Sequence, residues 1–176
     1  MKTETLLGIM KVLSWIVFIG LCINAGTPLI TYGISQFVNP EAARNLFNGL
    51  DLFAISQSHR YWYALLVLNF SAITALKAYM MYCVIKVLSN INLENPFSQP
   101  VFNLVSKLSG LALVIGIAII VTKNQTKWMA KTMDMGNYHG FFGGGDEFVF
   151  FAGILFIISL VFKRGMELQN ESELTI

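Results

Sequence analysis

Few side chains in this sequence have the types and spacing that catalysis, metal binding or cofactor binding requires. His59 and His139 each precede an apolar segment, which would suit axial haem ligands or a metal pair, but no third ligand stands beside them at a motif spacing. Cys22 and Cys83 do not form a C-x-x-C pair, and the glycines at 143–145 lack the lysine and hydroxyl residue of a phosphate-binding loop. We therefore expect a protein without a metal, a cofactor or an enzymatic activity.

Lys77 is the only charged residue well inside an apolar segment. A lysine at that depth in a bilayer costs about 2.5 to 3.5 kcal/mol, so we expect it to face other helices and to have partners there. Counted along helices, Asn24 and Ser109 lie at similar depths, whereas no carboxylate falls inside an apolar segment. These three intramembrane polar residues predict either structural hydrogen bonding or a site for ligand binding or gating.

The composition places these residues in a membrane. Of 176 residues, 55% are hydrophobic and 12% are charged, about half the charged fraction of a soluble domain, and the mean hydropathy is +0.62. The period-two alternation of a barrel strand is absent from all four apolar segments, 12–32, 61–87, 101–121 and 148–162. The sequence predicts an all-α integral membrane bundle of four transmembrane helices in a single domain.

Four spans put both termini on the same side of the membrane. We expect that side to be the cytoplasm of a multi-pass protein of the inner or plasma membrane, because basic residues lie close to those helix ends, namely Lys2, Lys11, Lys86, Lys107, Lys163 and Arg164. Residues 163–176 would then form a cytoplasmic tail. The two outer connections would be longer than the inner one at 88–100.

Both outer connections carry helix signals. In the first, Asn39 is placed to cap a short helix that starts at Pro40 and ends before Gly49. In the second, three lysines recur every four residues beside Trp128, which indicates an interfacial helix at the bilayer edge or a site for an anion or ligand; they are Lys123, Lys127 and Lys131.

Two stretches of the second half carry a distinctive pattern. The stretch NPFSQPVFNLVSKLSGLALVIG has a turn at Pro96, Phe97 and Ser98 before the third span. The chain ends on a second pattern, formed by Gly165, Leu168, Glu171, Glu173, Leu174, Thr175 and Ile176. Together they resemble a bacterial membrane family, domain of unknown function 2975 (DUF2975), in which an aspartate is usual at the position of Glu173.

This resemblance implies four transmembrane helices. In many members it also implies a neighbouring gene for a small Xre-type helix-turn-helix regulator, but no known activity.

The tail after Arg164 alternates apolar and polar residues. In an extended chain, one side would carry Met166, Leu168, Leu174 and Ile176 and the other would be acidic, whereas helical spacing scatters the four around the axis. Gly165 is a natural point for the last helix to fray. We expect a peptide ligand that adds to the edge strand of a cytosolic protein or is captured in a backbone nest of that protein; the alternative is a solvated tail whose alternation arose by chance.

Two classes of function follow from these patterns. The first is a regulatory or sensory membrane anchor that binds a small cytosolic helix-turn-helix protein through its tail and the inner loop at 88–100, which includes Pro96, Phe97 and Ser98. The second is a small-solute or ion pathway, formed by a homo-oligomer, with Lys77 lining it. A net charge of only +2 predicts that the chain itself does not bind nucleic acid.

Overall fold

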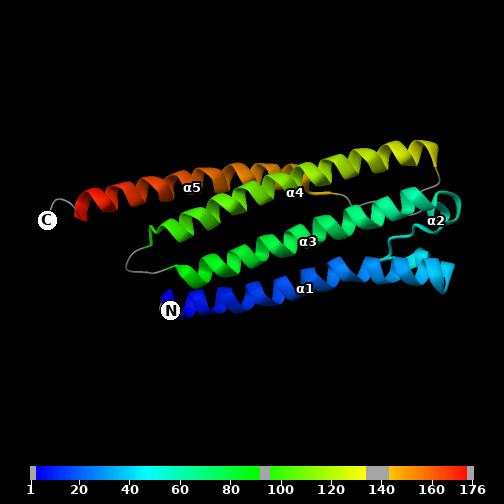
Figure 1. Cartoon of the computed structure of the whole chain (residues 1–176), viewed down its shortest axis with the longest axis horizontal. Coiled ribbons are helices and arrows are strands. Elements are labelled where there is room, and N and C mark those ends of the chain that lie inside the picture. Colours follow the sequence, from blue (N-terminus) through cyan, green and yellow to red (C-terminus); the bar gives the residue numbers. More distant parts are fainter. Residues whose placement is uncertain (1–2, 92–95, 134–142, 174–176) are drawn as a thin grey trace.

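The computed structural model describes residues 3–91, 96–133 and 143–173, and it is helical over most of these ranges. Four helices are long and apolar enough to cross a membrane, as predicted. No strand occurs in the described ranges, which confirms the all-α class. In chain order the elements are α1 (Thr3–Phe37), the 3-10 helix η1 (Pro40–Asn45), α2 (Phe53–Ser58), α3 (Arg60–Asn90), α4 (Gln99–Thr132) and α5 (Gly145–Glu173) (Figure 1).

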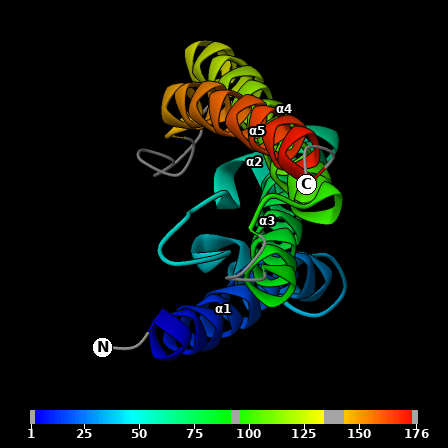
Figure 2. The ribbon, with the colours of Figure 1, turned by 90° about the vertical axis from the view of Figure 1, so that its left-hand side faces the viewer.

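The four long helices form an open row. Helix α1 packs on α3, α3 packs on α4, and α4 packs on α5, while α1 makes no contact with α4 or α5 in the described ranges. Figures 1 and 2 show this order from two directions. Helices α1 and α5 therefore each have one long neighbour and leave most of their apolar surface uncovered, as lipid-facing helices can.

A buried cluster at one end of the row joins α1, η1, α2, α3 and α4. The hydroxyl of Tyr63 lies 2.8 Å from that of Ser35, which links α3 to α1. The buried members of this cluster, which we call the outer core after the topology predicted from the sequence, are Ala43, Leu46, Leu50, Leu52, Ile55, Tyr63, Leu66, Val67 and Met129. The predicted cap is present, since the Asn39 side chain accepts a hydrogen bond from the Glu41 amide at 3.0 Å, and Gly49 has a φ of 84°.

Helices α4 and α5 approach each other closely at two glycines. A Cβ atom at Gly116 would lie 2.9 Å from the backbone oxygen of Gly145, and one at Gly145 would lie 3.0 Å from that of Gly116. Further along, the Ser109 hydroxyl donates to the Ala152 carbonyl at 2.9 Å. Small residues at such a crossing let helix backbones pack closely in a membrane.

Because of this crossing, α5 is shifted lengthwise relative to the other long helices. Gly116 lies near the middle of α4, so α5 begins beside the midpoint of α4 and extends past its start (Figure 1). Basic side chains of α4 occur at Lys107 and Lys123, about 24 Å apart at 1.5 Å per residue, on either side of Gly116 and within the roughly 30 Å of a hydrocarbon layer. The start of α5 therefore lies at a depth between the two levels.

The helices are longer than the predicted spans of 12–32, 61–87, 101–121 and 148–162, because hydropathy detects only their apolar parts. The region of Lys123, Lys127 and Lys131 is the final part of α4 and not a separate interfacial helix. The fourth span, predicted as the shortest, belongs to a helix of 29 residues.

The prediction of an extended tail is wrong for the described residues. Helix α5 continues through Gly165 to Glu173, and Leu174, Thr175 and Ile176 lie outside the described residues. Lys, Arg, Met, Glu, Leu and Gln all favour helices, and Arg164 pairs with Glu167 at 2.9 Å, one helical turn away.

Candidate functional site

The turn before α4 packs against α5. Gly165 leaves space for the Phe97 ring, because a Cβ atom at this glycine would lie 2.5 Å from a ring carbon of Phe97. The same ring makes an edge contact with Phe162, with 5.5 Å between the centroids. The structure thus joins two patterns that lie far apart in the sequence, the Pro-Phe-Ser turn and the glycine of the last pattern. We call this contact the inner junction, after the topology predicted from the sequence.

The residues that the sequence patterns singled out around Phe97 occupy different positions: some line a cleft and others do not. Pro100 lies in the first turn of α4, while Ser98 occupies the cap position without a side-chain capping bond. Around the junction is a polar cleft of about 340 Å³, lined by Phe97, Gln99, Lys163, Met166, Glu167, Gln169 and Asn170. Leu168, which is 52% exposed, and the exposed Glu171 do not line this cleft.

Replacing Gly165 by valine should displace Phe97 from α5. The added atoms would overlap the ring, and Phe97, at 37% exposed, can swing away, so we expect a local detachment of the turn with a loss of about 1 to 2 kcal/mol. Cysteines placed at Ser98 and Met166 should crosslink less efficiently in this variant. Gly153→Val is the control, because a Cβ atom there meets nothing within 4 Å; equal crosslinking in both variants would contradict the contact.

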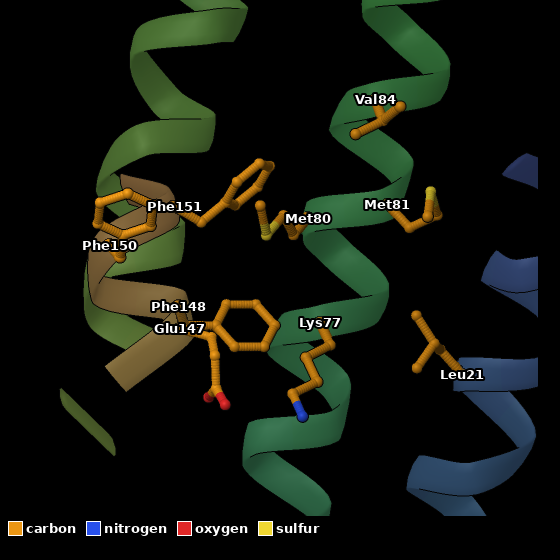
Figure 3. Close-up of a pocket in the computed structure, with 9 residues that line it drawn as sticks. All are labelled: Leu21, Lys77, Met80, Met81, Val84, Glu147, Phe148, Phe150 and Phe151. Carbon is orange, nitrogen blue, oxygen red and sulfur yellow. The ribbon is translucent and has the colours of Figure 1, made fainter. Parts of the chain in front are cut away.

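Lys77 lies in a groove of about 660 Å³ between α3 and α5 (Figure 3). Its Nζ atom is 5.1 Å from the centroid of the Phe148 ring, a cation–π distance. Glu147 lines the same groove, so the structure places a carboxylate near the level of Lys77, where sequence reasoning found none. The other lining residues are apolar: Leu21, Met80, Met81, Val84, Phe148, Phe150 and Phe151.

The position of Glu147 near Lys77 was not predicted from the sequence, because Glu147 directly precedes the apolar run that was taken as the span. The run of glycines and two acidic residues before that span is a signal for a helix start with a favourable N-terminal charge. The depth of that start could not be predicted, because it depends on where α5 crosses α4.

The three intramembrane polar residues do not form one cluster. Ser109 bonds to the backbone of α5, and Lys77 contacts Phe148, whereas the described residues provide no hydrogen-bond partner for the Asn24 side chain. Similar depth along separate helices therefore did not imply contact, because α1 and α4 are separated by α3.

The histidines and cysteines are dispersed. His59 lies 2.9 Å from the Ser58 hydroxyl, His139 lies outside the described residues, and Cys22 and Cys83 are free thiols. Within the described ranges, no three His, Cys, Asp or Glu side chains gather in a way that could hold a metal ion.

A comparison with known families matches residues 45–176 to the sequence model described as a protein of unknown function, DUF2975. The chain belongs to this family. No curated protein and no solved structure matches it.

The DUF2975 match includes α2, α3, α4 and α5, and hence the inner junction and both charged residues of the groove. Helix α1 precedes the matched segment and contributes Leu21 to the groove wall. The parts of this DUF2975 chain that could carry function are therefore the inner junction, with the helix that extends beyond it, and the α3–α5 groove.

Proposed function

We propose that this protein is a non-enzymatic regulatory anchor of the bacterial inner membrane that holds a small cytosolic helix-turn-helix protein. The observation that carries the proposal is that α5 continues as a helix to Glu173, about 13 Å beyond Arg164 at the helical rise. This projecting segment starts at the inner junction, which braces it against the start of α4.

The arrangement of charge supports cytoplasmic termini. Helix α1 begins and α5 ends at the same end of the row, opposite η1 and α2 (Figure 1). Two lysines near that end are held by tyrosines of α3, since Lys107 hydrogen-bonds Tyr79 and Lys86 lies 4.8 Å from the centroid of Tyr82. Positive charge at cytoplasmic helix ends is the usual determinant of orientation.

A projecting helix favours recognition in a partner's groove in place of strand addition. Glu167 and Glu171 are four residues apart and share one side of the helix, and the exposed Leu168 lies beside them. A helix-turn-helix protein carries a basic surface for DNA phosphates, and an acidic helix is complementary to such a surface. Binding here would compete with DNA and retain the regulator at the membrane.

Removing residues 166–176 should abolish partner binding without affecting membrane insertion, because the apolar part of α5 ends before Lys163. The tagged full-length chain is purified from its native membrane in mild detergent, and co-purified proteins are quantified by mass spectrometry. We expect a small helix-turn-helix protein with the intact chain and its loss with the truncated one.

The substitution Leu168→Ala tests the same surface more finely. As a central apolar contact it should lower partner recovery about tenfold. Leu160→Ala is the matched control, because Leu160 lies on the same helix at 48% exposure, against 52% for Leu168. Undiminished recovery after truncation, or equal effects of the two substitutions, would refute the proposal.

A further inference from the structure

The groove between α3 and α5 has one charged end and apolar walls. In Figure 3 the amino group of Lys77 and the carboxylate of Glu147 both point away from Val84, which lies two turns further along α3. Met80, Met81, Val84 and Phe151 provide the apolar walls on the side of Val84. A molecule that fills this groove must therefore combine a polar end with a long apolar part.

The direction of the groove fits a lipid of the outer leaflet. The charged ends of Lys77 and Glu147 point toward the end of α3 that carries η1 and α2, and the apolar walls continue toward the opposite end. Lys77 is about 12 Å along α3 from Asn69, whose side chain donates to Gln125 of α4. A head group held by Lys77 would thus lie well below the outer interface, with its acyl chain directed along α3 toward the level of Val84.

The charges of Lys77 and Glu147 indicate what kind of head group the groove can hold. Within the described residues, neither Lys77 nor Glu147 has a hydrogen-bond or ion-pair partner, and the ion pairs found there are those of Arg44 with Glu41 and Arg164 with Glu167. An anionic ligand would leave Glu147 unpaired at a depth where a charge is costly, and a cationic ligand would leave Lys77 unpaired. A zwitterion satisfies both groups.

We propose that this groove binds a phospholipid with a phosphoethanolamine head, whose phosphate pairs with Lys77 and whose ammonium pairs with Glu147. A primary ammonium donates hydrogen bonds to a carboxylate, which the quaternary ammonium of a choline head cannot do. Of the rings that line the groove, the one next to Lys77 is Phe148, and its face is already occupied by the Lys77 ammonium, so it is not open to a choline. The groove volume lies within the range of small-molecule sites, and Met81 and Val84 provide apolar surface for an acyl chain. This site does not depend on the proposed partner of α5.

The test uses the full chain in phosphatidylcholine nanodiscs that contain a minor fraction of a lipid with a photoreactive acyl chain. The same chain is attached to phosphoethanolamine, phosphocholine or phosphoglycerol heads, and labelled peptides are identified by mass spectrometry. Because phosphocholine and phosphoglycerol heads retain the phosphate for Lys77 but lack the primary ammonium that pairs with Glu147, we expect about tenfold more labelling of residues 77–84 and 147–151 by the phosphoethanolamine lipid. Equal labelling by the three lipids would identify an ordinary lipid contact and overturn the proposal, as would a preference for phosphoglycerol.

Two substitutions refine this test. Lys77→Met should lower labelling by the phosphoethanolamine lipid about tenfold, and Glu147→Gln should abolish its advantage over the phosphocholine lipid. Lys86→Met is the matched control, because Lys86 is also an α3 lysine over an aromatic ring but does not line the groove. An equal effect of Lys77→Met and Lys86→Met would overturn the proposal. The comparison of head groups uses the unaltered chain and needs no variant to fold.

Discussion

Replacing Gly116 by valine should separate α4 from α5 and strongly destabilise the protein. A Cβ atom at this position would lie 2.7 Å from a methyl carbon of Val149 and 2.9 Å from two backbone atoms of α5, the Gly145 oxygen and the Val149 nitrogen. Backbone atoms within a helix cannot move independently, so the whole helix must shift. Overpacking of this kind costs about 1 to 3 kcal/mol, and we expect the upper end because the clash involves backbone.

The measurement is the unfolding temperature in detergent, followed by size-exclusion chromatography after heating. Gly110→Val is the matched control in the same helix, because a Cβ atom at Gly110 meets nothing within 4 Å. Both substitutions change the helix propensity equally, so the difference between them reports the clash. If the two variants unfolded at the same temperature, the close crossing of α4 and α5 would be wrong.

Replacing Tyr63 by alanine should disrupt the outer core. Tyr63 is fully buried, its hydroxyl bonds to Ser35, and its ring centroid lies 5.2 Å from that of Tyr32. Removing a buried aromatic side chain costs about 3 to 5 kcal/mol. The expected result is faster proteolysis of the segment between α1 and α3, because η1 and α2 lose their packing against α3.

Tyr61→Ala provides the comparison, because Tyr61 belongs to the same turn of α3 but is 73% exposed. Its proteolysis should match that of the unaltered chain. Tyr63→Phe should fall between the two, since it retains the packing and loses only the hydroxyl, a contribution of about 1 kcal/mol. Rapid proteolysis of the Tyr61 variant would indicate that the outer core is organised differently.

The fold class was predictable from sequence because it depends on local properties. The apolar segments are long enough to require helices in a bilayer, and the Asn39 cap follows from side-chain chemistry within a few residues. The helix ends were less predictable, since α4 and α5 continue into polar sequence that hydropathy does not detect. The alternation after Arg164 favoured a strand, but local helix preference and the Arg164–Glu167 pair favour helix.

The candidate sites depended on contacts between distant segments. Phe97 and Gly165 were both singled out by the sequence, yet nothing in their spacing indicates that they touch. Glu147 lies beside Lys77 only because α5 begins at the midpoint of α4, which is set by the two glycines at the crossing. Asn24 and Ser109 show the converse, since equal depth did not bring them to Lys77.

The open row also bears on how the protein is made. Each long helix packs on the one that precedes it along the chain, so every interface can form as soon as the second helix of the pair leaves the ribosome and enters the bilayer. In a closed bundle, by contrast, the interface between the first and last helices could form only after the last helix had been synthesised. Assembly of this protein can therefore proceed during synthesis, in order, and α5, which is made last, completes the groove beside Lys77.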